Sequence, residues 1–133
     1  MRSYLGCFCG RDMLGRMNHE KAFAMPFADI YPLYLKKVER KGKTKAELDE
    51  VLCWLTGYDQ AGLDAAAASD MSLQELFDAI PELNPAASRI TGVICGYRVE
   101  EIEDPLMQKI RYMDKVVDEL ARGKKMESIK RHA

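Results

Sequence analysis

Apolar residues recur at three- and four-residue intervals along most of the chain, which is the spacing of one face of an α-helix. The first such stretch runs from Phe27 to Gly42. Pro32 lies inside it and has no backbone N–H, so we expect it in the first turn of this helix or at a break after a short preceding turn. The apolar positions of this predicted helix are Ile30, Leu33, Tyr34 and Val38.

Capping residues mark the helices that follow. Thr44 and Glu47 form a capping box, in which a hydroxyl and a carboxylate each satisfy a free backbone N–H at the start of a helix. Gly57 is expected to end that helix in the left-handed conformation. Asp59 and Ser72 are expected to cap two further helices. The apolar stripe of the helix after Thr44 consists of Leu48, Val51, Leu52 and Leu55.

The segment from Asn84 to residue 103 is harder to assign. Asn84 and Pro85 resemble a cap followed by proline at the first helical position. Apolar residues then continue at helical spacing, but Val93-Ile94-Cys95 lies between two glycines and fits a short strand equally well. We therefore leave helix and strand open for residues 93–99.

The longest helix is the clearest. Asp104 is expected to cap it, Pro105 to begin it, and Gly123 to end it after Arg122 in the last turn. A short basic helix is expected to follow over residues 124–131. The buried face of the long helix is predicted at Leu106, Ile110, Met113, Val117 and Leu120.

The predicted fold class is therefore all-α, a small single-domain orthogonal bundle of about five to six helices. It leaves room for a short irregular or extended segment near residues 92–103. Residues 1–22 have no helical period and contain three glycines. We expect them to form a poorly ordered N-terminal extension, and residues 23–133 to form the helical domain.

Composition agrees with a folded domain. Hydrophobic residues make up 47% of the chain and charged residues 31%, the balance of an ordinary globular protein. The longest apolar runs are far too short to cross a bilayer. A net charge of −1 argues against nucleic-acid binding by the whole surface, because such binding depends on many basic contacts to phosphate. A soluble, cytoplasmic protein without membrane contact is the simplest interpretation.

The cysteines do not indicate a disulfide framework or a metal site. Cys53 lies within a predicted helix and Cys95 in an apolar run, where free cysteine behaves as a small hydrophobic residue. Cys7 and Cys9 could chelate a soft metal together with His19, but the four ligands of a structural zinc site are missing. We predict neither a metal nor a cofactor.

Several ordered sequence blocks resemble a known bacterial family, the one catalogued as domain of unknown function 2200. The resemblance covers roughly residues 22–128. Members of the family begin near the position of Met17, so residues 1–16 lie outside the resemblance. It implies a compact helical domain and no particular activity. The blocks that carry it are Met25-Pro26-Phe27, Tyr31-Pro32-Leu33-Tyr34, Glu39-Arg40-Lys41-Gly42, Trp54-Leu55-Thr56-Gly57-Tyr58, Leu83-Asn84-Pro85, Gly92-Val93-Ile94-Cys95-Gly96 and residues 98–107.

No catalytic constellation is evident. The two histidines, His19 and His132, lie near the two ends of the chain, where mobility is expected. There is no phosphate-binding glycine loop, serine elbow or zinc-binding histidine pair. A carboxylate enzyme would need Asp104, Asp114 and Asp118 to converge, but a cap at Asp104 and a solvated position at Asp118 are the favoured interpretations. We predict no catalytic residue.

Four residues form a candidate ligand or partner surface. Trp54 and Tyr58 share a helix edge, which favours packing of a helix end over an aromatic binding surface. Arg98 lies among four acidic residues, and we predict that it is buried and paired with a carboxylate. The alternative is an anion site formed by Arg98 and Arg111.

Charge is distributed unevenly along the chain. Residues 46–88 contain nine acidic residues and no lysine or arginine, whereas residues 124–131 are mainly basic. Such segregation can steer a partner of opposite sign, but an ordinary solvated surface of a near-neutral protein is the favoured interpretation of the pattern itself. Among functions, the first hypothesis is a non-catalytic module that recognises a protein partner, or itself, through an acidic and a basic face. The alternative is a weak nucleic-acid binder, and an enzyme with a carboxylate and arginine site is a distant third. The candidate basic patch consists of Lys36, Lys37, Arg40, Lys41, Lys43 and Lys45.

Overall fold

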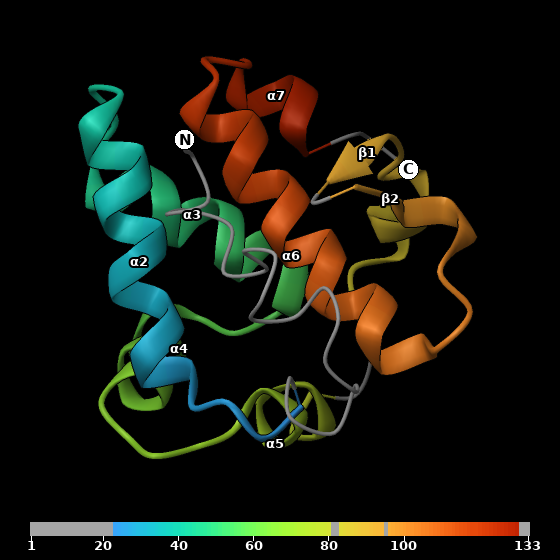
Figure 1. The fold of residues 1–133 in the computed structure, drawn as a ribbon. Helices are drawn as coiled ribbons and strands as arrows, with labels where there is room; N and C mark the ends of the chain where they lie inside the picture. The colour runs from blue at the N-terminus through green and yellow to red at the C-terminus, as the bar shows by residue number, and fades with distance from the viewer. Residues whose placement is uncertain (1–22, 81–82, 95, 131–133) are drawn as a thin grey trace.

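The structure is a computed structural model that describes residues 23–80, 83–94 and 96–130. Most of this part of the chain is helical, as the all-α prediction requires (Figure 1). The predicted extension, residues 1–22, lies outside the described residues. The elements in chain order are α2 (Phe27–Arg40), α3 (Lys45–Thr56), α4 (Gln60–Ala67), α5 (Leu73–Asp78), η3 (Pro85–Arg89), β1 (Val93–Ile94), β2 (Tyr97–Arg98), η4 (Val99–Glu101), α6 (Pro105–Ala121) and α7 (Met126–Ile129).

The predicted caps are present at the helix starts. Thr44 and Ser72 each form a complete capping box with the glutamate three residues later. Asp59 accepts a hydrogen bond from the backbone N–H of Gly62 at 2.7 Å. These side chains satisfy N–H groups that a helix leaves without an internal partner in its first turn. The boundaries of α3, α4 and α5 are therefore fixed by local chemistry.

Two glycines end helices as the sequence predicts. Gly57 follows α3 with a φ of 87°, and Gly123 follows α6 with a φ of 93°. Both angles lie in the left-handed region, where a side chain with a Cβ is strained. The two turns are therefore set by the backbone.

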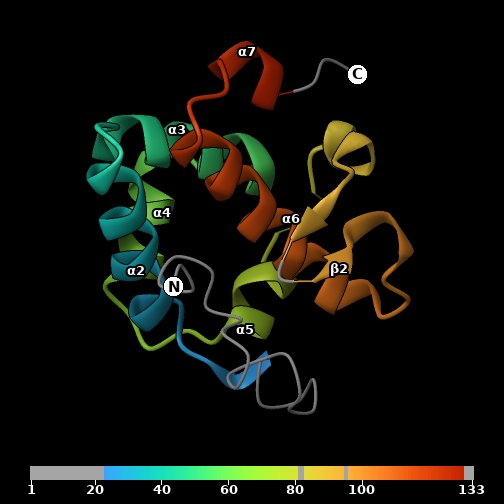
Figure 2. The same ribbon diagram turned by 45° about the horizontal axis from the view of Figure 1, so that its top comes forward.

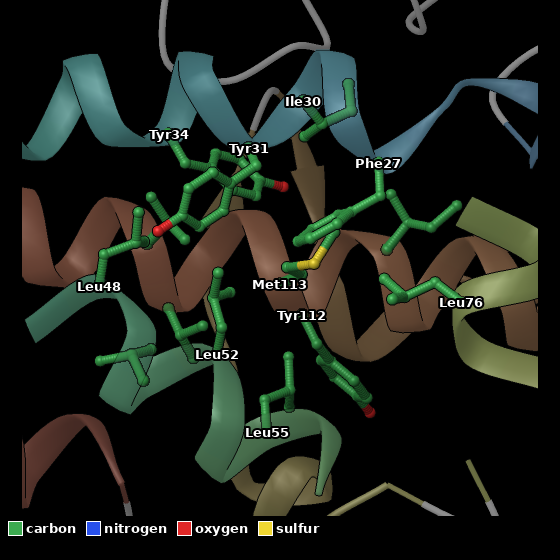
Figure 3. Packing of buried hydrophobic residues seen from close by; sticks show 14 of the residues in the cluster. Phe27, Ile30, Tyr31, Tyr34, Leu48, Leu52, Leu55, Leu76, Tyr112 and Met113 are labelled. Carbon is green, nitrogen blue, oxygen red and sulfur yellow. The ribbon is translucent and has the colours of Figure 1, made fainter. Parts of the chain in front are cut away.

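The long helix α6 is the centre of the molecule. It packs against α2, α3, α5 and α7 and against β1 and η4. Figure 3 shows the ring of Phe27 in α2 beside Met113 of α6, and Leu48, Leu52 and Leu55 of α3 belong to the same cluster. Burial of this continuous apolar core is the main stabilising contribution.

Backbone hydrogen bonds join the segment before α2 to the segment before α5. The N–H of Phe27 donates to the carbonyl of Met71 at 2.9 Å, and the N–H of Leu73 donates to the carbonyl of Met25 at 2.8 Å. Pro26 and Ser72 face each other in this short antiparallel bridge. The start of α2 is thereby held beside the start of α5.

The position of Pro32 differs from the prediction. The helix already begins at Phe27, so Pro32 lies in its second turn rather than its first. A proline there cannot donate the usual hydrogen bond to the carbonyl four residues earlier. Tertiary packing of Phe27 and Ile30 against the core outweighs this local cost.

The uncertain segment is extended. Val93 pairs with Arg98 and Ile94 pairs with Tyr97 in a two-stranded antiparallel hairpin. Gly96 in the connecting turn has a φ of 86°, a conformation that glycine adopts without strain. The strand interpretation of residues 93–99 is therefore the correct one for its first part, and η4 follows it.

Candidate functional site

Trp54 and Tyr58 connect the end of α3 to α5 and to Asn84 through hydrogen bonds. The Tyr58 hydroxyl donates to the carbonyl of Leu76 in α5 at 2.8 Å. The carbonyl of Trp54 accepts from the side-chain amide of Asn84 at 3.1 Å. Both rings are half-buried against the core, and burial raises the pKa of Tyr58. The geometry supports the packing interpretation that we favoured for this pair.

Arg98 pairs with a carboxylate as predicted, but the prediction that it is buried is wrong. Its side chain is 55% exposed and forms an ion pair with Glu100 at 3.0 Å. Glu100 also accepts from the backbone N–H of Gly92, and this hydrogen bond and those from its own backbone and Arg98 lower its pKa. The carboxylate of Glu100 therefore holds the backbone at Gly92, just before the hairpin, whereas the side chain of Arg98 remains exposed.

Arg111 is fully buried and cannot contribute to a surface with Arg98. Its guanidinium, 1% exposed, donates to Asp114 at 3.0 Å. The other carboxylate oxygen of Asp114 accepts from the Tyr34 hydroxyl at 2.5 Å, which joins α2 to α6 (Figure 3 shows Tyr34 of this pair). Burial raises the pKa of Asp114 to about 6, although Arg111 and the hydrogen bonds act in the opposite direction. These three side chains form a buried polar network.

The three aspartates of the α6 region do not form one site. Asp104 caps the helix by accepting from the N–H of Met107 at 2.9 Å, as predicted. Asp114 lies ten residues further on, which is ~15 Å along a helix. Asp118 is buried, so the prediction of a solvated position there is wrong. A convergent carboxylate site that includes Asp104 is excluded by this spacing.

Asp118 joins two basic segments that are far apart in the sequence. One of its carboxylate oxygens accepts from the Lys37 ammonium at 2.9 Å, and the other accepts from the Arg122 guanidinium at 2.8 Å. Lys37 belongs to α2 and Arg122 follows α6. The candidate basic patch and the basic C-terminal segment therefore meet at one carboxylate.

A second polar network surrounds Asp49 at the start of α3. Its carboxylate accepts from the Tyr31 hydroxyl, from Lys45 at 2.8 Å and from Gln60 at 2.9 Å. Burial alone would raise the pKa of Asp49, but the hydrogen bonds from Lys45, Tyr31 and Gln60 lower it. Burial and the neighbouring Asp49 raise the pKa of Tyr31 to about 12. Asp49 thus remains a buried anion that fixes α2, α3 and α4 to each other.

The candidate basic patch divides into paired and available cations. Lys37 and Lys45 are paired with Asp118 and Asp49. In the part of the chain that the structure describes, the other four members take part in no ion pair. Three of them are exposed and one is half-buried. They are Lys36, Arg40, Lys41 and Lys43.

An acidic surface lies at α5. Asp70, Glu75 and Asp78 are exposed and line a hollow of about 470 Å³. A second hollow of about 470 Å³ lies between α3 and α7, where Glu50 accepts from Lys130 at 2.6 Å. Both are open depressions of the surface with charged rims, unlike the enclosed apolar clefts that hold small molecules.

The described residues contain no cluster of potential metal ligands. No group of three or more His, Cys, Asp or Glu side chains in residues 23–80, 83–94 and 96–130 is placed to hold a metal ion. Cys53 is a half-buried free thiol within α3, and burial is the main cause that raises its pKa. The cysteines and histidines considered from the sequence, Cys7, Cys9, His19, Cys95 and His132, lie outside the described residues.

The two tyrosine–aspartate pairs were not predicted from the sequence. A signal for one of them was present, because Arg111 and Asp114 are three residues apart beside the predicted apolar positions Ile110 and Met113. Charged residues at helical spacing next to a buried stripe indicate a buried pair. The tyrosine partners come from α2, so their identity depends on the tertiary fold.

Comparison with known proteins agrees with the helical architecture. The profile of a bacterial family described as "Uncharacterized protein conserved in bacteria (DUF2200)" matches residues 21–131. A solved structure titled "Crystal structure of uncharacterized protein SP1917" is similar to this chain with a TM-score of 0.79 and 42% sequence identity. The similarity covers 86% of this chain and 93% of the other. No curated protein matches the chain.

The chain belongs to the DUF2200 family, and the resemblance carried by the sequence blocks is confirmed. It is a conserved bacterial domain with a mostly helical fold. None of the helices in the described part of the chain combines the length and apolar character needed to cross a membrane.

Proposed function

We propose that this DUF2200 protein is a non-catalytic module that binds a protein partner through its charged surfaces. The observation that carries the proposal is the separation of charge in space. Exposed acids gather around α5, and exposed cations gather at the C-terminal end of α2 and around α7. Figures 1 and 2 show α5 at one end of the molecule and α7 at the other. Charge separated in this way orients a partner of opposite sign.

The chemistry of the interior supports a non-catalytic role. Catalysis needs a reactive group at a cleft that a substrate can enter. The buried carboxylates Asp49, Asp114 and Asp118 are each bonded to side chains of their own chain, and those bonds join helices. Their perturbed environments are accounted for by packing. This use of buried charge fits a scaffold that presents a surface.

A weak nucleic-acid binder is the second candidate. The specific observation in its favour is that Asp118 brings the end of α2 and the turn after α6 together. Two adjacent basic segments give a phosphate backbone more contacts than either alone. Affinity for nucleic acid would then fall steeply as the salt concentration rises.

The test is recovery of a partner from the native cells. The full-length chain, expressed in its own bacterium with an affinity tag, is isolated near physiological salt with and without nuclease treatment. We expect one protein in a reproducible ratio to the bait, unchanged by nuclease and released by high salt. Tyr34→Phe is the control for changes that leave the charged surface intact, because Tyr34 is fully buried, and this variant should retain the same protein.

Failure has two distinct forms. Recovery of nucleic acid alone, with loss of all retained protein after nuclease, would support the second candidate instead. Recovery of no macromolecule at any salt concentration, from a chain that is folded by circular dichroism, would contradict both candidates.

A further inference from the structure

The turns that follow α2 and α6 lie at the same end of the molecule. Lys37 and Arg122 reach the two oxygens of one carboxylate, that of Asp118, at 2.9 and 2.8 Å. At the same end, Lys130 after α7 is paired with Glu50 of α3 at 2.6 Å. Figures 1 and 2 both show the C-terminal end of α6 leading into α7 beside α3. Basic residues separated by more than eighty positions in the sequence therefore share one surface.

Five cations on this surface are available to a partner. In residues 23–80, 83–94 and 96–130, none of them takes part in an ion pair, whereas their neighbours Lys37, Lys45 and Lys124 do. Four are exposed and Lys43 is half-buried. We call this set the basic end. Its members are Lys36, Arg40, Lys41, Lys43 and Lys125.

The spacing of the basic end suits an acidic segment of a protein. Lys36 and Arg40 are four residues apart on α2 and so occupy the same face of that helix. Lys41 and Lys43 continue the surface into the turn around Gly42. Carboxylates repeated along a helix or an extended segment could meet these positions in succession, and Arg40 can bind one of them with two hydrogen bonds.

The hollow between α3 and α7 adds a concave surface to the basic end, because Lys125 is one of the residues that line it. It is lined by Glu50, Lys125, Met126, Glu127 and Lys130. Met126 contributes a flexible apolar side chain to this lining. Since Glu50 is already bonded to Lys130, the positive charge of Lys125 remains available at this edge.

Two observations favour protein over nucleic acid as the partner. The only large hydrophobic side chain that is exposed in the described residues is Val93, which lies in the hairpin, so the basic end has no exposed aromatic ring on which the bases of a single strand could stack. Acidic residues also interrupt the surface, because Glu39 and Glu127 lie within it. A regularly charged phosphate backbone would be repelled at those positions, whereas a protein segment can place neutral or basic residues there.

We propose that the basic end is the partner-binding surface and that its partner is an acidic segment of another protein. This inference rests on the proposed function and names the surface and the chemistry of the partner. The acidic surface at α5 then serves to keep the molecule from binding in the reverse orientation.

The experiment measures binding to defined anionic probes at low ionic strength. Fluorescence anisotropy follows titration of the full chain into a short labelled peptide of alternating glutamate and serine, and into a short DNA duplex. Arg40→Gln with Lys41→Gln removes two charges from the basic end. Arg98→Gln with Lys109→Gln removes the same charge elsewhere, because Lys109 lies ~20 Å along α6 from Arg122.

The expected result is selective. The first pair should weaken peptide binding about five-fold or more and the second pair less than about two-fold, with the peptide bound more tightly than DNA. Equal weakening by both pairs would overturn the inference, because only net charge would then matter. Preference for DNA, lost with the first pair, would overturn the choice of a protein partner, and no peptide binding at all would overturn the surface itself.

The proposed function has a separate readout. If Arg40→Gln with Lys41→Gln still recovers the native protein partner in full, the interaction module stands and the basic end is not its binding surface. If the wild-type chain recovers no protein, the proposed function fails whatever the peptide titration shows.

Discussion

The inward and outward faces of α2 use polar side chains in opposite ways. On the inward face, the hydroxyls of Tyr31 and Tyr34 donate to the buried carboxylates of Asp49 and Asp114. On the outward face, Lys36 and Arg40 are exposed, and in the described part of the chain neither takes part in an ion pair. The buried hydroxyls of this helix are therefore hydrogen-bonded within the chain, whereas its cations Lys36 and Arg40 have no acidic partner in the described residues.

This difference gives a way to separate the charged groups that the fold requires from those that are available to a partner. A buried ionisable group is costly unless it is paired, so the interior groups reveal what the fold needs. An exposed lysine or arginine has little effect on stability whether or not it is paired. The exposed set is therefore free to be arranged for a partner, and stability measurements can tell the two sets apart.

The largest expected effect is the loss of the buried cation. Arg111→Met leaves the Asp114 carboxylate without its charged partner and should destabilise the domain by about 3–5 kcal/mol in urea denaturation. Adding Asp114→Leu and Tyr34→Phe to that variant should recover most of the loss, because apolar side chains then replace the whole buried network and the Tyr34 hydroxyl is not left without its acceptor. Lys109→Met on the same helix is the control, with a change below about 1 kcal/mol. If Arg111→Met were as stable as wild type, the distinction between buried charges that the fold requires and exposed charges that it does not would be wrong.

The glycines that end α3 and α6 test whether the backbone fixes the ends of the bundle. Gly57→Val and Gly123→Val should each destabilise by about 1–2 kcal/mol, because valine is strained at positive φ. A Cβ at either position meets no other atom within 4 Å, so the cost comes from the backbone alone. Asparagine, which tolerates this conformation, should cost less at both positions. Equal stability of the valine and asparagine variants in thermal melts would contradict this explanation.

The pH dependence should distinguish the two buried carboxylates. The pKa of Asp114 is raised to about 6, so the folded chain binds a proton more tightly there than the unfolded chain does. Its contribution to the free energy of unfolding should therefore rise by about 1 kcal/mol as the pH falls from about 7 to about 5. This is measured as the stability of wild type relative to Asp114→Asn at the two pH values, and a relative stability that falls would contradict it.

Asp49 serves as the control, because its pKa is shifted in the opposite direction to that of Asp114. Its pKa is lowered by its hydrogen bonds, so the stability that it contributes is present above its ordinary pKa and is lost as the pH falls through the lowered value. Wild type should therefore lose stability relative to Asp49→Asn in acid, the reverse of the result for Asp114. The same sign at both sites would show that the two environments are not distinct.

The smallest expected effect is at Arg98. Its ion pair with Glu100 is exposed, so Arg98→Ala should change stability by less than about 1 kcal/mol. The melting temperature should shift by only a few degrees, in contrast to the large effect at Arg111. A loss comparable to that of Arg111→Met would mean that the hairpin depends on Arg98 and would remove the distinction between the two arginines.

The fold was largely predictable because its signals are local. Capping boxes at Thr44 and Ser72 and the glycine at 123 specify helix ends from a few neighbouring residues. Pro32 was expected in the first turn of α2 or at a break, and it lies in the second turn instead, because Phe27 and the bridge from Pro26 to Ser72 hold the start of the helix through tertiary contacts. The hairpin at residues 93–98 stayed open because two-residue strands carry too little periodicity to distinguish from a helix turn.

The candidate site was less predictable because pairing depends on three-dimensional proximity. Sequence neighbours suggested that Arg98 would be clamped by the acids around it, but the chain leaves the hairpin base exposed. Arg111 was considered only as an alternative partner of Arg98 in an anion site, and the packing of α2 over α6 buries it instead. Asp118 was expected in solvent, but it joins two basic segments that no local pattern connects.

The most direct test of the central claim is a map of where an acidic segment contacts the folded chain. Backbone amide chemical shifts of the labelled full-length protein are recorded by NMR during titration with the glutamate–serine peptide. The account predicts that the largest shifts occur at residues 36–43 and 122–125, with small changes around Asp49 and Asp114. Shifts centred on α4 and α5, on the hairpin, or spread evenly over the molecule would contradict the claim that the basic end is the binding surface.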